Sequence, residues 1–240
     1  MAQNPARGGR DHYPTPKLYS DWAVKRALAM SEAARSCTGH NPPMYVLEPG
    51  CGGGAPFLHS AVEQHPFKQA LGVELSGEGE TGKLPLLWYG RDFMTLTDEE
   101  LAPFSNSRGK FDLIATNPPF SVAENFITKS LELLDPWGVM VFLLRLQVVG
   151  SEKRMHLWRN RPPHEIATFV RRISFDGIGT DYTEYACFFW LGEQLKGLGT
   201  RFYWVDNTSV KKRNVQTVVE EFGHGVDVAL QLDKECSCKS

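Results

Sequence analysis

The chain has 240 residues, of which 42% are hydrophobic and 22% are charged, enough to bury one sizeable core in a single domain. It contains no run of the roughly 18–20 apolar residues that a membrane-spanning helix needs. The net charge of −2 excludes a uniformly basic nucleic-acid-binding protein, so any surface of that kind must be local.

Cysteine usage and the amino terminus predict a cytoplasmic protein. The five cysteines form no regular framework, which is typical of a reducing compartment. Cys236-x-Cys238 could touch a metal, but no histidine or second cysteine pair lies nearby, so no metal site is predicted. Residues 1–10 are polar, unlike a secretory signal. We expect a disordered segment over 1–11, one folded domain over 12–206 and a poorly defined extension over 207–240.

The first patterned stretch is Pro14-Thr15-Pro16, a stiff turn before a helix for which Ser20 or Asp21 is the predicted N-cap. A turn that presents backbone N–H groups and a threonine hydroxyl can bind a carboxylate. An ordinary helix entry explains the same residues, so this stretch alone identifies no site.

A strand, a glycine turn and a helix follow. Met44 to Leu47 is a short apolar strand that leads into Glu48-Pro49-Gly50-Cys51-Gly52-Gly53-Gly54, and a helix is predicted from Phe57 to Gln64. A doubly wound nucleotide-binding sheet begins in this way, and glycines let the backbone approach a ligand closely. The glycine spacing differs from the dinucleotide-binding pattern, and glycine turns are common.

The next two predicted strands each end beside an acid. Gln69 to Val73 precedes Glu74, and Leu86 to Gly90 precedes Arg91-Asp92-Phe93. An acid after the second strand of such a sheet can accept both hydroxyls of a ribose. Asp92 could take the amino group of an adenine while Phe93 covers its ring. Surface carboxylates at strand ends are the alternative for each.

The most informative stretch is Asn117-Pro118-Pro119-Phe120, directly after the predicted buried strand Phe111 to Thr116. The two prolines end the strand, because neither donates to a ladder. The turn offers the Asn117 side-chain oxygen and the Pro118 carbonyl as acceptors for an exocyclic amine, which localises the nitrogen lone pair. The Phe120 ring can stack on the attached base. A plain proline-stiffened turn is the alternative.

A helix capped by Ser121 is predicted from Ser121 to Leu134, and Asp135-Pro136-Trp137-Gly138 ends it. Apolar and aromatic runs predict the remaining strands. These strands are Val139 to Leu144, Glu165 to Val170, Tyr185 to Leu191 and, paired beside the last of them, Arg201 to Val205.

Positive charge is concentrated between residues 145 and 172, which hold seven basic and two acidic residues. Arg145, Lys153, Arg154 and Arg172 are therefore candidates for contacts with phosphates. A solvated basic face is the alternative.

Taken together, these motifs resemble those of class I S-adenosylmethionine-dependent amino-methyltransferases, most of all the small phage-type DNA N6-adenine methyltransferases. The resemblance covers roughly Tyr13 to Leu191 and keeps the family's order of motifs. It implies an α/β, Rossmann-like methyltransferase domain over 12–206, with a seven-stranded, mostly parallel sheet, helices on both faces and one reversed strand near the edge. It also implies that a target base in a duplex leaves the stack, at a cost of a few kcal/mol.

The resemblance assigns roles to individual residues. Asn117, Pro118, Pro119 and Phe120 match the catalytic motif. The positions that match motifs holding S-adenosylmethionine are Pro14, Thr15, Glu48, Gly50, Gly52, Glu74, Asp92 and Phe93. Two features depart from the family: no separate recognition domain is evident, so low sequence specificity is expected, and Ser76 to Leu84 is unusually rich in glycine and glutamate.

The sequence therefore predicts transfer of a methyl group from S-adenosylmethionine to the N6 amine of adenine in nucleic acid, and the resemblance favours DNA. An adenine in RNA, a protein side-chain amide or the N4 of cytosine could use the same turn. Asn rather than Ser before the prolines favours adenine over cytosine, and the basic stretch favours nucleic acid over protein. A catalytically inactive subunit with this fold is the alternative from another class.

Overall fold

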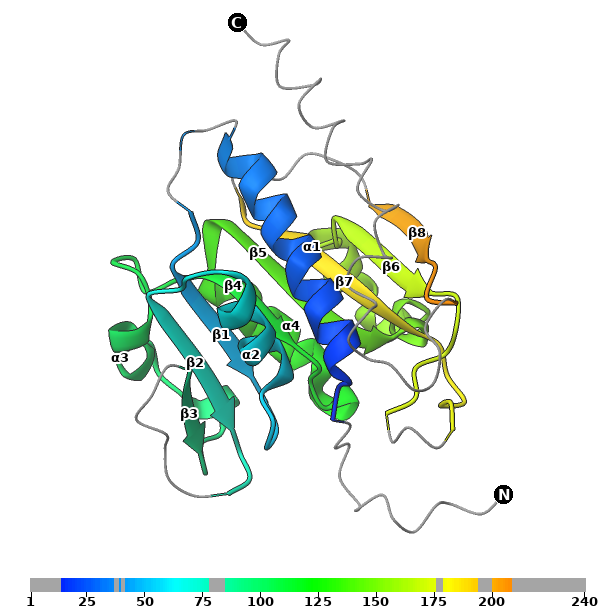
Figure 1. Cartoon of the computed structure of the whole chain (residues 1–240), viewed down its shortest axis with the longest axis horizontal. Helices are drawn as coiled ribbons and strands as arrows, with labels where there is room; N and C mark the ends of the chain where they lie inside the picture. Colours follow the sequence, from blue (N-terminus) through cyan, green and yellow to red (C-terminus); the bar gives the residue numbers. More distant parts are fainter. Residues whose placement is uncertain are drawn as a thin grey trace, which may run out of the picture.

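The computed structural model describes residues 14–36, 39, 42–77, 85–175, 179–193 and 200–208. The predicted disordered segment 1–11, the extension beyond residue 208 and the pair Cys236 and Cys238 lie outside these residues. The described chain forms one eight-stranded sheet flanked by helices (Figure 1). The strands are β1 (Tyr45–Pro49), β2 (Gln69–Glu74), β3 (Leu86–Tyr89), β4 (Phe111–Thr116), β5 (Leu134–Arg145), β6 (Glu165–Phe169), β7 (Tyr185–Leu191) and β8 (Arg201–Val205).

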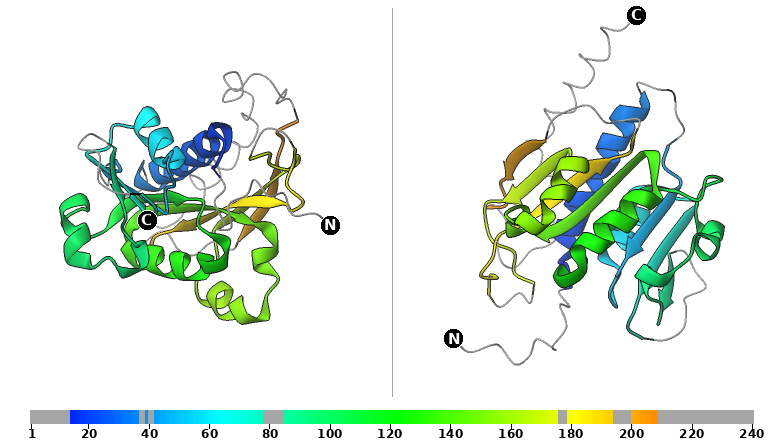
Figure 2. Two further views of the ribbon diagram at one scale, coloured as in Figure 1. Left: turned by 90° about the horizontal axis from the view of Figure 1, so that it is seen from below. Right: turned by 180° about the vertical axis from the view of Figure 1, so that it is seen from behind.

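The helices connect these strands and cover both faces of the sheet. The α-helices are α1 (Lys17–Ser36), α2 (Pro56–Gln64), α3 (Asp98–Leu101), α4 (Ala123–Leu133) and α5 (Met155–Asn160). Short 3₁₀ helices are η1 (Phe93–Thr95), η2 (Ala102–Phe104), η3 (Phe120–Val122), η4 (Leu146–Val149) and η5 (Glu152–Arg154). Helices α1 and α2 lie on one face and α4 lies on the other (Figure 2).

The strand order is β3-β2-β1-β4-β5-β7-β6-β8. Strands β1 to β5 pair in parallel, and β7 is antiparallel to both of its neighbours, β5 and β6. From the centre of the sheet, strands β1, β2 and β3 follow one another toward one edge, and β4 and the later strands lie toward the other edge. The order therefore reverses between β1 and β4, where open α/β sheets bind their ligands at the carboxyl ends of the strands.

The predicted α/β fold with helices on both faces and a reversed strand is confirmed, with eight strands instead of seven. The extra strand, β8, does not pair with β7 as predicted. It pairs in parallel with β6, because both edges of β7 are already taken by β5 and β6.

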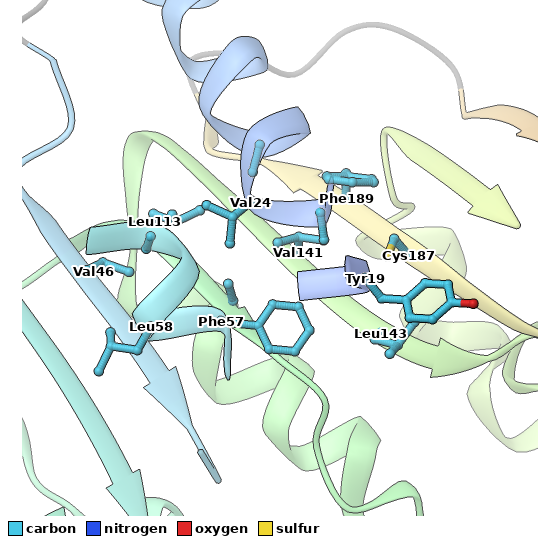
Figure 3. Packing of buried hydrophobic residues seen from close by; sticks show 14 of the residues in the cluster. Tyr19, Val24, Val46, Phe57, Leu58, Leu113, Val141, Leu143, Cys187 and Phe189 are labelled. Atoms are coloured by element: carbon cyan, nitrogen blue, oxygen red, sulfur yellow. The ribbon is translucent and has the colours of Figure 1, made fainter. Parts of the chain in front are cut away.

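Strand β5 shows how the sequence fills two cores. Its alternate residues Val139, Val141 and Leu143 pack into the cluster under α1 and α2, whereas Met140, Phe142 and Leu144 pack into the cluster under α4. A strand buried on both faces reads as a continuous apolar run for this reason. Figure 3 shows Val141 and Leu143 of β5 in one cluster with Val24 of α1 and Phe57 of α2.

Two predicted N-caps are wrong. Helix α1 already begins at Lys17, so Ser20 and Asp21 lie inside it. Their polar groups are used against α2 instead: the Ser20 hydroxyl shares a hydrogen bond of 2.9 Å with the Ser60 hydroxyl, and the Ser60 hydroxyl lies 2.6 Å from Asp21 Oδ1. Ser121 is part of η3, and α4 begins two residues later without a side-chain cap.

Strand β5 begins at Leu134, five residues earlier than predicted, and includes the Asp135–Gly138 stretch. The buried Asp135 carboxylate accepts hydrogen bonds from the Trp137 N–H, the Asn106 amide and the Arg108 guanidinium, which fixes the stretch in place. Pairing with β4 shifts register between Phe111 and Leu113, which accommodates the proline in β5.

Candidate active site at the carboxyl ends of the strands

The Asn117-Pro118-Pro119-Phe120 turn lies at the carboxyl end of β4, next to the point where the strand order reverses. The buried Thr116 hydroxyl donates a hydrogen bond of 2.6 Å to the Pro49 carbonyl and ties the end of β4 to the end of β1. The turn leads directly into η3 and α4. The two prolines therefore fix a rigid turn beside the loop that follows β1.

Thr15 and Asn117, which are far apart in the sequence, meet at this turn. The Asn117 Nδ2 donates a hydrogen bond of 3.0 Å to the Thr15 hydroxyl, and Thr15 is 7% exposed. A primary amide carries its oxygen and nitrogen on opposite sides, so holding the nitrogen sets the direction of the oxygen. Thr15 thus orients the amide of Asn117.

The glycine loop packs against the same turn. Gly50 and Gly52 have φ angles of +65° and +60°, a region that glycine adopts without strain. A Cβ on Gly50 would lie 3.2 Å from the Phe126 ring and 3.7 Å from Pro119. Glycine at position 50 therefore allows the loop to lie directly on the Asn117–Phe120 turn.

Glu48 was predicted to contact a cofactor, but its side chain is only 2% exposed. Its Oε2 accepts a hydrogen bond of 2.7 Å from the Leu58 N–H, and its Oε1 accepts one of 3.4 Å from the Phe57 N–H. Burial raises the pKa of this carboxyl well above its ordinary value. Glu48 caps the first turn of α2 and so anchors the glycine loop from below.

Glu74 reaches from the end of β2 to the glycine loop. Its Oε2 accepts a hydrogen bond of 2.7 Å from the Gly52 N–H, and its Oε1 accepts from both the N–H and the hydroxyl of Ser76, at 2.9 and 2.7 Å. These bonds use three of the roughly four acceptor sites of a carboxylate. A ribose that offers two hydroxyls would therefore take the remaining site and displace one Ser76 donor.

Asp92 and Phe93 follow β3 but face different surroundings. Asp92 is half-buried and caps η1, where its Oδ1 accepts a hydrogen bond of 2.9 Å from the Met94 N–H. Phe93 is 2% exposed, with its ring centroid 5.2 Å from that of Phe126. Little of the Phe93 ring remains to cover an adenine, and its packing supports the backbone that carries Asp92.

Phe120 stands at the centre of an aromatic and charged cluster. The Arg145 guanidinium lies 4.5 Å above its ring centroid, and the buried Tyr185 ring lies 5.7 Å away. The Tyr185 hydroxyl donates a hydrogen bond of 2.7 Å to Asp181. Burial and the Asp181 carboxylate raise the pKa of Tyr185, and Arg145 opposes this shift. The guanidinium already covers one face of the Phe120 ring, so a stacked base would take the other.

A pocket of about 310 Å³ opens beside Phe120, a size within the range of ligand-binding pockets. Leu144 and Val148 supply apolar surface, and Gln147 and Ser121 supply polar groups. Arg145 and Arg154 add positive charge. The pocket is therefore suited to a flat, partly apolar group attached to an anion.

No family model and no curated protein sequence matches this chain. Solved structures do match. The methyltransferase subunit of a type I restriction-modification system from Streptococcus thermophilus aligns over 92% of this chain and 53% of its own, with a TM-score of 0.59 and 14% identity. The chain thus spans about half the length of that subunit.

Two further structures align in the same way. A protein from Listeria monocytogenes, provisionally described as a class I S-adenosylmethionine-dependent methyltransferase, aligns over 90% of this chain and 72% of its own, with a TM-score of 0.57 and 10% identity. The restriction-modification enzyme LlaBIII, solved bound to DNA, aligns over 84% of this chain and 20% of its own, with a TM-score of 0.56 and 12% identity.

The protein has the class I methyltransferase fold. Identities this low show a shared fold alone, so the function rests on the site. The residues of the site fit S-adenosylmethionine. Glu74, which is bonded to the Gly52 N–H, and Asp92 offer carboxylate acceptors for hydroxyl and amino groups, and the glycine loop is open at Gly53 and Gly54, where a Cβ would meet nothing within 4 Å. Cys51, in that loop, points inward and is 3% exposed.

The methyltransferase fold does not bring all the predicted basic residues to the pocket. Arg145 and Arg154 line it, and Lys153 is the chain neighbour of Arg154. Arg172 instead pairs with Glu184 at 2.7 Å, on the loop before β7. Three of the seven basic residues in this stretch have acidic partners from outside it, namely Arg154 with Glu124, Arg161 with Glu193 and Arg172 with Glu184. The local excess of positive charge is therefore smaller than the sequence suggests.

Two polar residues of the site carry no sequence signal of their own. Ser76, which bonds to Glu74, and Gln147, which lines the pocket, belong to no motif. Within the described residues, no helix is long and apolar enough to cross a membrane. The same residues contain no group of three His, Cys, Asp or Glu side chains placed to hold a metal ion.

Proposed function

We propose that the protein transfers a methyl group from S-adenosylmethionine to the exocyclic N6 amine of an adenine in DNA. The observation that carries the proposal is the position of the Asn117–Phe120 turn at the switch point of the sheet, in contact with the glycine loop. An amine held by the turn would thereby lie beside a ligand held by the loop.

The turn holds the amine and prepares its nitrogen. Asn117 Oδ1 and the Pro118 carbonyl accept its two N–H groups, and Thr15 orients the amide that supplies the first acceptor. Hydrogen bonds from both N–H groups to these oxygens draw the nitrogen toward tetrahedral geometry and make its lone pair available. Phe120 stacks on the base, and this stacking contributes about 1–3 kcal/mol.

Glu74, Asp92 and the loop around Gly50 and Gly52 would hold S-adenosylmethionine. When bound, S-adenosylmethionine supplies an electrophilic methyl group. Glu74 would accept the ribose hydroxyls and Asp92 the amino group of the adenine moiety. Glu48 acts from beneath by fixing the first turn of α2, and Phe93 by fixing the backbone at Asp92.

DNA is the proposed substrate for two reasons. The pocket next to Phe120 is lined by Arg145 and Arg154, which suit a phosphate-bearing ligand. Proteins with a similar fold include a type I restriction-modification subunit and an enzyme solved bound to DNA.

The test is transfer of tritium from labelled S-adenosylmethionine by the purified protein. Duplex DNA, single-stranded DNA, total RNA and a protein extract are offered separately, and the labelled product is digested and identified by chromatography. Asn117→Ala should abolish labelling and leave binding of S-adenosylmethionine unchanged in calorimetry, whereas the exposed Asn160→Ala serves as the matched control and should retain activity. N6-methyladenine from DNA supports the proposal. Label confined to RNA or protein, or full turnover by Asn117→Ala, contradicts it.

A further inference from the structure

Three exposed apolar residues lie next in the chain to residues that line the pocket beside Phe120. Val122, Val149 and Met155 are 38%, 43% and 43% exposed. Each is the direct chain neighbour of a residue that lines the pocket, namely Ser121, Val148 and Arg154. We call these three side chains the apolar collar. They come from η3, η4 and the start of α5, so the tertiary structure brings the segments that carry them to one pocket.

The pocket combines apolar surface with positive charge. Leu144 and Val148 line it together with Phe120, while Arg145 and Arg154 supply two guanidinium groups. A ligand that satisfies both features must present flat apolar faces and anionic groups at short intervals. A nucleic-acid strand has this chemistry.

The collar distinguishes an unpaired strand from a duplex. In a duplex the base faces are stacked against one another, and a protein surface meets mainly phosphates, sugars and groove edges. Apolar side chains gain little from phosphates, whose desolvation is costly. An unpaired strand exposes its base faces, which can lie on apolar and aromatic side chains while its phosphates reach the arginines.

We propose that the apolar collar binds the nucleotides that flank the target adenine in an unpaired DNA strand, and that single-stranded DNA is the preferred substrate. The inference rests on the proposed function for its substrate and adds the state of the strand. In a single strand the target base needs no extrusion from a duplex, so the cost of flipping is largely avoided.

The test measures binding and methylation separately. Fluorescence anisotropy compares a fluorescein-labelled single-stranded DNA oligonucleotide with its duplex and with the RNA of the same sequence, and tritium transfer gives kcat/KM for the same substrates. We expect the DNA single strand to bind and react at least about tenfold better than the duplex. Val149→Thr and Met155→Gln keep size but add polarity, and each should weaken binding of the single strand about two- to fivefold with little change for the duplex.

Val170→Thr is the matched control, because Val170 is 53% exposed but follows β6, two strands away from β5. It should bind both DNA forms as the wild type does. Equal or tighter binding of the duplex overturns the inference, as does tighter binding of the RNA. Wild-type affinity in both collar variants also overturns it. So does a wild-type dimer that these variants dissociate, because the collar would then bind a second copy of the chain. Anisotropy requires no methyl transfer, so a failed proposed function would appear as binding without label.

Discussion

The hydrogen bond between Asn117 and Thr15 makes Thr15→Val the most informative substitution. Valine has nearly the shape of threonine but cannot accept the 3.0 Å hydrogen bond from Asn117 Nδ2. A hydrogen bond of this kind contributes about 0.5–1.5 kcal/mol. If the bond serves to aim the Asn117 oxygen at the amine, its loss should lower kcat by about two- to tenfold, because 1.4 kcal/mol is tenfold.

The assay is steady-state tritium transfer at varied S-adenosylmethionine concentration, with Thr15→Ser as the control that keeps the hydroxyl. Thr15→Val should lower kcat and leave the KM for S-adenosylmethionine unchanged, and Thr15→Ser should stay close to the wild type. The resemblance instead implies that Thr15 contacts S-adenosylmethionine. A raised KM with an unchanged kcat would therefore refute the orienting role and restore that contact.

Three further predictions follow from other contacts. Burial raises the pKa of Glu48, so the folded protein binds the proton of this carboxyl group more tightly than the unfolded chain does. Stability should then fall as pH rises from about 4.3 through the raised pKa, and Glu48→Gln should flatten this trend in urea unfolding. Ser76→Ala removes a donor that competes for Glu74 and should tighten S-adenosylmethionine binding about two- to fivefold in calorimetry, whereas weaker binding would mean that Ser76 contacts the ligand. Reversing the charges of Lys153 and Arg154 should lower nucleic-acid affinity and reduce its log–log salt slope by about 1.4–1.8, and an unchanged slope would leave them as solvated surface.

The fold could be predicted from the sequence because its signals are local. A continuous apolar run such as Val139 to Leu144 is typical of a strand buried on both faces, and a glycine turn between a strand and a helix is typical of the first crossover of a doubly wound sheet. The errors lie where local rules compete with packing. Ser20 and Asp21 have the chemistry of N-caps, but in the fold their side chains form hydrogen bonds with Ser60 of α2.

The site was only partly predictable. Asn117 and Gly50 directly follow strands and Glu74 is the last residue of one. Parallel strands bring such residues to one edge of a sheet, so their grouping follows from sequence order. Sequence order does not determine which of these residues face a ligand. Glu48 and Phe93 belong to the same motifs as exposed neighbours, yet the one caps α2 and the other packs on Phe126.

The sequence by itself determined the class of fold, the order of the strands that carry motifs and the chemical groups that the Asn117–Phe120 turn offers, because these depend on residue type and short-range spacing. Tertiary structure alone decided the contact between Thr15 and Asn117, the partners of the basic residues and the pocket to which the segments carrying Val122, Val149 and Met155 contribute. Such contacts join residues from separate elements, and their distances depend on how helices and loops pack on the sheet, which short-range spacing does not encode.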